Sequence, residues 1–367
     1  SLQDNLHQPS PQPRPGTTTT MAAQMRHLLV FGLFLGVVCF FAGAMAQEES
    51  VAAGPKPKVF VFTDANTDDV QAIKLLLKYS NVEVAALIPD CAGFCNMGPA
   101  IQNLFGLLHF MDRDDIPIWA GQAYASAEID SGDYGCRYAK TVPLFPKGKI
   151  WADTILGLNR RYPHPPENRN YYPNYTTVFT NLPQAVAATD GPVYFLSLGA
   201  FSTIDFLYRQ NPWLVQRVDR LFVMGGAVFV PGNLFFPKGQ APNTVAECNI
   251  YTDPEAVRAV FTSGTPTTLV PLDATNAFQL SWDWLNSFGA IARTKEARFC
   301  HDLLALIKNN SASTSMYSLW DPLTAAILAD SSLIVEQVTL NLTVAITGDQ
   351  VGRTVIDDVD GKPVQVV

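Results

Sequence analysis

The residues with the clearest chemistry form a short acidic segment, DANTDD at 64–69, which follows the apolar run at 59–62. Asp64, Asp68 and Asp69 place their carboxylates where a buried strand would end and a helix would begin. Crowded carboxylates repel one another, so such a group costs stability unless a cation neutralises it. We therefore predict a metal site at this loop.

The types of ligand restrict the metal. Oxygen donors without a neighbouring His or Cys are typical of Ca²⁺ or Mg²⁺ sites, whereas zinc favours nitrogen and sulfur. Two other interpretations stay open from these residues alone. Asp68 or Asp69 could simply cap the N-terminus of the helix, and the same loop would suit a metal-dependent phosphohydrolase.

Short apolar runs without polar alternation predict strands that are buried on both faces of a sheet. They lie at 59–62, 84–88, 193–198, 221–230 and 267–272. Helical patterns alternate with them, at 69–78, 98–111, 254–261, 297–308 and 322–329. We therefore predict an open α/β fold, with a mainly parallel central sheet flanked by helices. Ligands of such sheets bind outside the carboxyl ends of the strands, where the acidic loop lies.

The N-terminal residues indicate processing rather than fold. Residues 1–20 are polar and precede the first Met, so we interpret them as a leader outside the fold. At 21–46 a positive flank, a short apolar run and a small-residue end predict a cleaved secretory signal peptide, because the run is shorter than the roughly 20 residues of a membrane span. Residues 47–57 would form a linker and 58–367 one large domain. An apolar segment lies shortly before Val367, which leaves a further domain open.

Composition restricts the partners. The chain has 25 Lys and Arg against 33 Asp and Glu, a formal net charge of -8, and no basic run. We therefore expect a small neutral ligand rather than a nucleic-acid polymer, which is bound by clustered Lys and Arg. We also expect secretion without a stable membrane anchor, and an assembly of several copies stays open. N-glycosylation patterns begin at Asn174, Asn309 and Asn341.

Ordered motifs between 58 and 329 resemble those of the nucleoside hydrolases. The loop at 64–69 is similar to the D-x-N-x-D-D loop of the inosine-adenosine-guanosine branch of that family. Further matches are MGGA at 224–227, GN at 232–233, AECNIYTDPEA at 246–256, LDAT at 272–275 and WDPLTAA at 320–326. The stretch YGCRY at 134–138 resembles the extracellular branch of plants and related eukaryotes.

The resemblance implies a nucleoside hydrolase fold with a Rossmann-like core. It also implies Ca²⁺-dependent hydrolysis of the N-glycosidic bond of ribonucleosides to free base and ribose. Purine nucleosides such as inosine, adenosine and guanosine are the expected substrates, and nucleoside salvage is the expected use. A secreted nucleoside-binding homologue without activity is the alternative of a different class, which the intact set of acids disfavours.

The resemblance further implies roles for individual residues. Asp64, Asp69, Asp321 and the backbone carbonyl of Leu198 would hold Ca²⁺, and Asp64 would also be the general base that deprotonates the attacking water. Trp320 stands where some members have a proton-donating His, and would stack on the base. The expected nucleoside-binding residues are Asn66, Asp68, Asp90, Asn233, Glu247, Asn249, Trp320 and Tyr134.

Two other aspartates match family motifs but are interpreted as structural. Asp253 precedes Pro254 and is expected to cap a helix, and Asp273 is expected to serve the fold. The chain also departs from the family pattern at Phe62, Ala65 and Cys248, and its spacer between the GN and AECN motifs is longer than usual. None of these departures removes an expected ligand, but the longer spacer would reshape specificity.

Overall fold

Buried β-branched and aromatic residues build a ten-stranded sheet within the described residues, in the order β11-β10-β12-β7-β6-β5-β1-β2-β3-β4. Its strands are β1 (Lys58–Thr63), β2 (Glu83–Pro89), β3 (Ile118–Trp119), β4 (Tyr171–Tyr172), β5 (Val193–Ser197), β6 (Arg220–Met224), β7 (Thr267–Val270), β10 (Val338–Val344), β11 (Thr354–Ile356) and β12 (Lys362–Val366). All neighbouring strands from β12 to β4 are parallel, and only the two pairs that involve β10 with β11 and β12 are antiparallel. The predicted mainly parallel α/β sheet is therefore confirmed.

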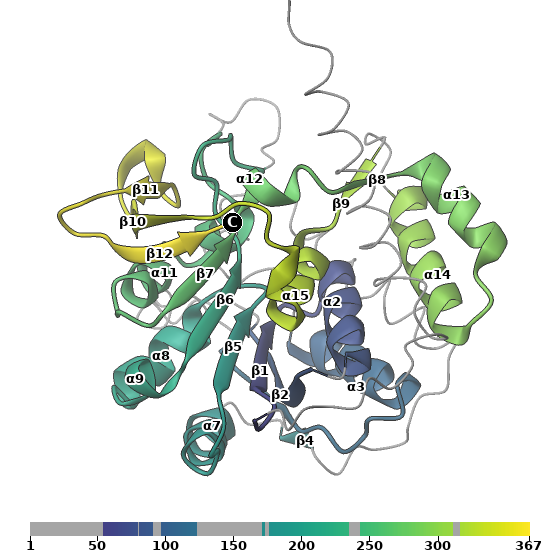
Figure 1. Cartoon of the computed structure of the whole chain (residues 1–367), viewed down its shortest axis with the longest axis horizontal. Coiled ribbons are helices and arrows are strands. Elements are labelled where there is room, and N and C mark those ends of the chain that lie inside the picture. Colours follow the sequence, from purple (N-terminus) through teal and green to yellow (C-terminus); the bar gives the residue numbers. More distant parts are fainter. Residues whose placement is uncertain are drawn as a thin grey trace, which may run out of the picture. The chain divides into compact units, whose positions relative to one another are not determined.

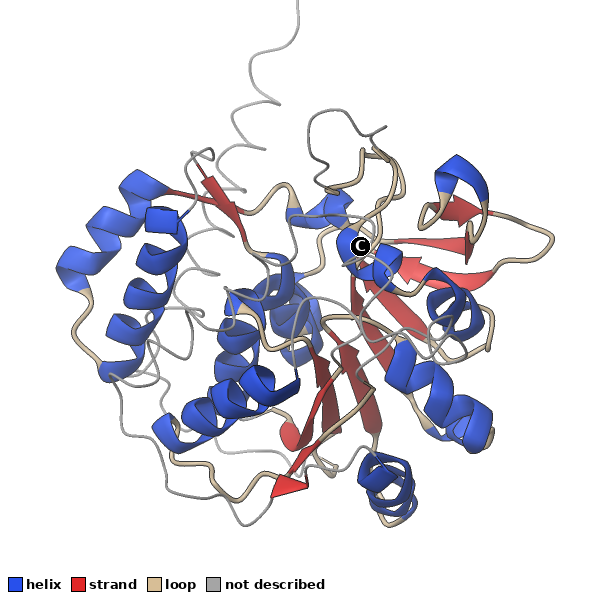
Figure 2. Cartoon of the chain, turned by 180° about the vertical axis from the view of Figure 1, so that it is seen from behind, coloured by secondary structure: helices blue, strands red, loops and turns tan. Residues whose placement is uncertain are grey.

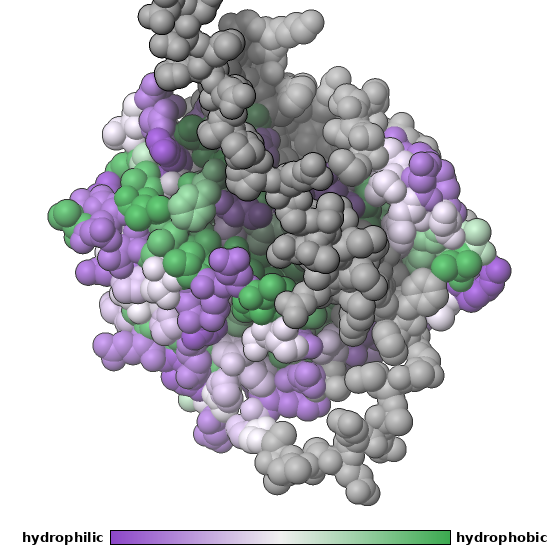
Figure 3. Space-filling view, turned by 45° about the horizontal axis from the view of Figure 1, so that its top comes forward, coloured by the Kyte–Doolittle hydropathy of each residue, from purple (hydrophilic) through white to green (hydrophobic). Residues whose placement is uncertain are grey.

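This computed structural model describes residues 54–79, 81–90, 97–122, 171–172, 176–234, 243–310 and 316–367. They belong to one compact unit, Ala44–Val367. The predicted leader, the signal peptide and Tyr134 lie outside the described residues, and so does most of the linker. No described helix is both long enough and apolar enough to cross a membrane. On the face that Figure 3 shows, both hydrophobic and hydrophilic residues of the described part reach the surface.

Helices cover both faces of the sheet (Figures 1 and 2). The helices are α2 (Thr67–Lys78), α3 (Met97–Phe110), α7 (Thr176–Ala187), α8 (Ser202–Gln210), α9 (Leu214–Arg217), α10 (Cys248–Thr252), α11 (Pro254–Phe261), α12 (Leu272–Thr275), α13 (Trp282–Ile291), α14 (Lys295–Asn310) and α15 (Trp320–Ala329), with 3-10 turns η2 (Ser331–Leu333) and η3 (Gly348–Gln350). Figure 1 shows α7, α8 and α11 on one side of the sheet and α2, α3 and α15 on the other. A separate antiparallel pair, β8 (Gln279–Ser281) and β9 (Met316–Ser318), precedes α13 and α15.

The main core lies between the sheet and α7, α8 and α11. Phe60 and Phe62 on β1 pack with Phe195 on β5, with ring centroids 5.9 and 5.1 Å apart. All three rings are fully buried. Phe62 departs from the family pattern, and this packing explains why a Phe fits at that position. Its ring faces the core beneath the acidic loop.

The predicted strand at 221–230 is too long. β6 ends at Met224, because the chain turns at Gly226, where φ is 83°. This left-handed conformation favours glycine, and a Cβ at Gly226 would lie 2.9 Å from the hydroxyl oxygen of Thr354. The residues after Gly226 instead form a loop at the carboxyl edge of the sheet.

Candidate functional site

The acidic loop joins the carboxyl end of β1 to the N-terminus of α2. The side chain of Asn66 accepts a hydrogen bond from the Thr67 N–H (2.8 Å), and the Asp69 carboxylate accepts one from the Asn66 N–H (3.3 Å). The Asn66 side chain also accepts from the backbone of Asp69, and this reciprocal arrangement of Asn66 and Asp69 is a capping box. Asn66 is therefore the N-cap of α2 and Asp69 takes part in the capping box, a role that is compatible with the metal site predicted for Asp69.

The capping bonds leave Asp69 held in one orientation. Its Oδ1 also accepts from the hydroxyl of Thr63 and from the Asp64 N–H, the latter at 3.1 Å. Between them Ala65 adopts φ 54°, a left-handed conformation that is uncommon for a residue with a Cβ. Thr63 had not been predicted as a site residue, although a hydroxyl that directly precedes the acidic loop was a usable signal.

Carboxylates from two helices meet beside this loop. Asp68 and Asp69 begin α2, and Asp321 lies in the first turn of α15, which packs against α2. One oxygen of each lies within 4.8 Å of the others. Asp69 and Asp321 are 1% and 2% exposed. Asp64 is not one of these three, but it is 4% exposed and its charge raises the pKa of Asp321.

Burial and mutual repulsion make these acids hard to ionise. Burial, followed by the charge of Asp69, raises the pKa of Asp64 well above its ordinary value. Burial and the charge of Asp68 do the same for the pKa of Asp321. The pKa of Asp68 rises to about 7, again chiefly through burial and then through Asp69. A cation held between them would offset both effects.

The donor set fits a hard cation. The clustered donors are carboxylate oxygens alone, which suits Ca²⁺ or Mg²⁺. None of the ion pairs between described residues involves Asp64, Asp68, Asp69 or Asp321, so no described Lys or Arg neutralises the cluster.

The end of β5 lies against the acidic loop. Leu198 follows β5, and its N–H donates to the carbonyl of Phe62 on β1 (2.9 Å). A Cβ at the next residue, Gly199, would lie 3.1 Å from the Cβ of Asp64, so a side chain there would require Asp64 to shift slightly. The carbonyl of Leu198 accepts a hydrogen bond from the Asn249 side chain (3.2 Å). A carbonyl oxygen has a second lone pair, so this bond is compatible with a ligand role.

Glu247 and Asn249 lie near the acids from the next segment along the carboxyl edge. Glu247 caps the short helix α10, and its Oε2 accepts from the N–H groups of Ile250 (3.2 Å) and Gly226 (3.0 Å). Its charge contributes to the raised pKa of Asp68, and burial raises the pKa of Glu247 itself. The structure therefore brings Glu247 to the cluster.

Asn233 belongs to the same edge. Its side-chain oxygen accepts from the Cys248 N–H (2.9 Å), which ties the 231–234 loop to α10. Gly232 lies so close to this segment that a Cβ there would be 1.9 Å from the carbonyl oxygen of Ala246. The side-chain oxygen of Asn233 therefore serves the loop.

Three other aspartates accept hydrogen bonds from groups of the fold. The fully buried Asp90 accepts from the Thr203 N–H at the start of α8 (2.8 Å). Asp253 accepts from the Ala256 N–H (3.2 Å) and the Ser202 hydroxyl (2.6 Å), which confirms the predicted helix cap. Asp273 accepts from two successive backbone N–H groups, those of Val228 (2.9 Å) and Phe229 (2.8 Å), as a structural residue would. The structure does not place Asp90 in the carboxylate cluster.

Trp320 adjoins Asp321 and packs against a tyrosine that sequence reasoning missed. The ring of Tyr317 meets the indole edge-on, with centroids 5.6 Å apart. Tyr317 is buried, its hydroxyl lies 3.5 Å from that of Thr67, and burial followed by the charge of Asp68 raises its pKa well above 10. An aromatic residue shortly before the WD motif was the available signal, although Tyr317 lies on strand β9 and not on the helix. The structure does not test a partner for the indole at Tyr134, which lies outside the described residues.

Comparison with known proteins agrees with this arrangement. The model of the family "Inosine-uridine preferring nucleoside hydrolase" matches residues 59–367. Nucleoside hydrolase 3 of Arabidopsis thaliana is 28% identical over 334 residues, covering 78% of this chain and 37% of the relative. Nucleoside hydrolase 4 of the same plant is 27% identical over 359 residues, covering 88% and 64%. The chain thus spans less than two thirds of the length of these plant relatives.

A bacterial relative and two solved structures extend the comparison. The pyrimidine-specific ribonucleoside hydrolase RihA of Escherichia coli is 26% identical over 315 residues, covering 81% of this chain and 92% of the relative. A plant nucleoside hydrolase has a TM-score of 0.68 at 24% identity, covering 85% of this chain and 94% of that one. An inosine-uridine preferring nucleoside hydrolase of Bacillus anthracis has a TM-score of 0.69 at 23% identity, covering 84% and 93%. These structures share the fold. With the family match over 59–367, they lead to one conclusion: the chain belongs to the inosine-uridine preferring nucleoside hydrolases, a family of enzymes that cleave N-glycosidic bonds.

Proposed function

We propose that this chain hydrolyses the N-glycosidic bond of ribonucleosides with the help of Ca²⁺, and that purine nucleosides are its preferred substrates. The observation that carries the proposal is the group of carboxylates from α2 and α15, with Asp69 and Asp321 buried and Asp68 partly buried, which has no described Lys or Arg to neutralise it. A cluster of this kind costs stability and is retained where it binds a cation.

Asp64, Asp69, Asp321 and the Leu198 carbonyl would hold the ion. Bound Ca²⁺ would lower the pKa of the attacking water and of the Asp64 carboxyl. Asp64 would accept the proton of the attacking water as general base, and its Oδ1 is oriented by the hydrogen bond that it accepts from the Asn66 N–H (3.3 Å). Asp69 is less suited to this task, because its oxygens are already occupied by the Thr63 hydroxyl and two backbone N–H groups.

The remaining residues would hold the sugar and the base. The reaction develops positive charge on the ribose, which the carboxylates of Asp68 and Glu247 would stabilise. Asn66, Asn233 and Asn249 would supply polar contacts to the ribose. Trp320 would stack on the base, and the edge-on contact with Tyr317 would fix the plane of the indole.

The purine preference follows from ring area. A two-ring purine shares more surface with an indole than a one-ring pyrimidine does, so stacking on Trp320 favours it. We further propose that the protein is secreted and glycosylated, which the signal-like segment at 21–46 and the glycosylation patterns support.

The decisive test is release of free base and ribose from inosine, adenosine, guanosine and uridine, with and without a chelator. We expect turnover of the purine nucleosides that stops with chelator and returns with added Ca²⁺. Asp64→Asn should lower kcat by at least ~10²-fold, the usual scale for loss of a general base. Asp253→Asn is the matched control, because this buried aspartate caps α11 and lies outside the cluster.

Each contrary outcome has a distinct meaning. Calcium binding without base release would indicate a nucleoside-binding protein. Release of phosphate from phosphate esters, with nucleosides left intact, would indicate a phosphohydrolase. Efficient uridine cleavage with little inosine cleavage would refute the purine preference alone.

A further inference from the structure

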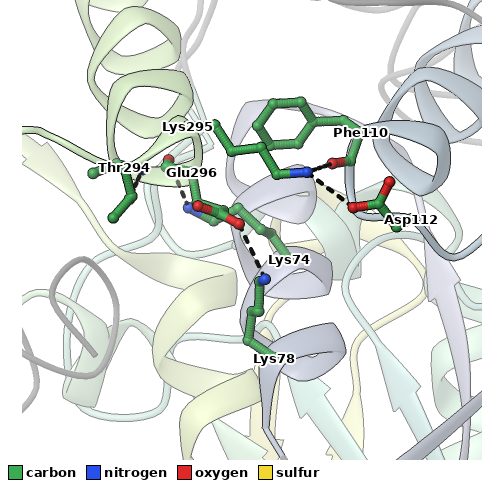
Figure 4. A network of polar contacts seen from close by, with 8 residues as sticks. Lys74, Lys78, Phe110, Asp112, Thr294, Lys295 and Glu296 are labelled. Atoms are coloured by element: carbon green, nitrogen blue, oxygen red, sulfur yellow. Dashed lines mark hydrogen bonds and ion pairs between the residues drawn. The ribbon is translucent and has the colours of Figure 1, made fainter. Parts of the chain in front are cut away.

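An amine and a thiol are in direct contact between α2 and α14. Lys74 on α2 is 5% exposed and Cys300 on α14 is fully buried. The Nζ of Lys74 donates to the Sγ of Cys300, and also to the backbone carbonyl of Glu296 at 3.4 Å. Figure 4 shows Lys74 extending from α2 toward α14, beside Glu296. This pair lies outside the site described above and takes no part in the proposed reaction.

The carboxylates near Lys74 form ion pairs with other lysines. Glu296 pairs with Lys78 (3.0 Å), and Asp112 pairs with Lys295 (3.0 Å), whose ammonium also bonds the Phe110 carbonyl (Figure 4). No ion pair between described residues includes Lys74. Buried charges are normally paired, so a buried lysine that faces a thiol and a neutral carbonyl requires another explanation.

We propose that Lys74 and Cys300 are a modification site, at which hydrogen peroxide forms a covalent nitrogen–oxygen–sulfur bridge between α2 and α14. The amine contacts the sulfur directly, so an oxygen atom added to the sulfur has the nitrogen as its neighbour. Both partners lie on helices, and the ion pair between Lys78 and Glu296 joins these two helices (Figure 4). The reacting atoms therefore meet at a fixed position.

The bridge forms in two oxidations, each by one peroxide molecule. In the first, the thiol takes one oxygen atom: Cys–SH + H₂O₂ → Cys–S–OH + H₂O, the usual entry to cysteine oxidation. In the second, an N–O bond forms as one N–H and the sulfenic O–H are lost: Cys–S–OH + H₂N–Lys + H₂O₂ → Cys–S–O–NH–Lys + 2 H₂O. The chain gains one oxygen atom and loses two hydrogen atoms. Two molecules of dithiothreitol return the four electrons and restore the amine and the thiol, with release of water.

The bridge can be detected by mass spectrometry of the full chain. The folded protein is incubated with peroxide for hours, because burial slows cysteine oxidation and the helices must open transiently to admit the oxidant. Remaining thiols are alkylated, and the chain is cut at acidic and aromatic residues so that Lys74 is not itself a cleavage site. We expect one peptide that contains Lys74 linked to one that contains Cys300, with the mass change given above, and loss of the link after dithiothreitol.

Matched variants separate the bridge from general oxidation. Cys248→Ser removes the other described thiol and should leave the link intact. Cys300→Ala and Lys74→Arg should both abolish it, and Arg keeps the positive charge. If Lys74→Arg does not fold, the peptides of the wild type and of Cys300→Ala decide the question. An unlinked Lys74 peptide alongside sulfinic or sulfonic acid at Cys300 would overturn the proposal. So would a Cys300 that stays reduced while Cys248 is fully oxidised.

Discussion

Replacing Asp321 with Asn should change the stability of the chain in opposite directions with and without calcium. Asn has nearly the shape of Asp but no charge. Without metal, the substitution removes repulsion from a buried cluster, so the free energy of unfolding should rise. With calcium, it removes a charged ligand, so the stabilisation by the ion should fall. A purely structural aspartate would show only a loss.

The size of the gain follows from the geometry. Oxygens of Asp321, Asp68 and Asp69 lie within 4.8 Å of one another, so each like-charged pair costs at least about 3 kcal/mol at an effective dielectric constant of about 20. Two pairs would give about 7 kcal/mol, but the carboxyls escape part of this by taking up protons. At pH 7 a carboxyl with an ordinary pKa of 3.8 can take up a proton at a cost of about 4 kcal/mol, and this limits the repulsion that Asp321 bears. Because Asn keeps some cost of burying a polar group, we expect a gain of about 1–3 kcal/mol at pH 7.

Urea unfolding of the chelator-treated protein would measure the gain, and calorimetric titration would measure calcium affinity, which should fall at least ~10-fold. Asp253→Asn is the control. Asp253 is as buried as Asp321, caps α11 and accepts a hydrogen bond from the Ser202 hydroxyl. The substitution should therefore lower the free energy of unfolding by about 1 kcal/mol and leave the calcium affinity unchanged. An Asp321→Asn chain that is less stable without metal and binds calcium like the wild type would refute the reasoning.

Three further predictions follow. Ala65→Gly should keep activity and raise the free energy of unfolding, measured with urea, by up to ~1 kcal/mol. Glycine adopts φ 54° without the strain that a Cβ causes, and its entropic cost is small. A lower free energy of unfolding would contradict this. Trp320→Ala should reduce kcat/KM for inosine more than for uridine, by roughly 2- to 13-fold from stacking alone, and equal losses would limit the indole to shaping the pocket. Because the pKa of Asp68 rises from 3.8 to about 7, the metal-free chain should lose stability as pH rises through this range. For the same reason calcium binding at pH 6 should release protons, and calorimetric heats independent of the buffer would argue against it.

The regular elements could be predicted from the sequence because their signals are local. The apolar run at 84–88 and the helical pattern at 254–261 match β2 and α11 closely. The run at 221–230 was misread because hydrophobicity continues past Gly226, where the backbone turns. The two antiparallel strand pairs at the C-terminal edge were not predicted, since their strands are partly exposed and lack a continuous apolar run.

The site was predictable to the extent that its residues lie in short motifs. The motifs located Asp64, Asp69 and Asp321. They did not show which carboxylate oxygens accept hydrogen bonds from the helix and its loop, and which are available to a ligand. That distinction depends on bonds such as the Thr63 hydroxyl to Asp69. Tyr317 escaped prediction because its proximity to Asp68 and Thr67 arises only when α15 packs on α2.

The distance along the chain between the two parts of the carboxylate cluster affects how the protein is made. Contacts across it join residues as far apart as Thr67 and Tyr317, which are 250 positions from one another. During synthesis from the N-terminus, the acidic loop leaves the ribosome long before Asp321 exists, so the early chain carries repelling carboxylates without the full set of ligands. If the proposed ion binds at this cluster, it stabilises only a chain in which α15 has docked, and so favours the completely folded molecule over its nascent forms.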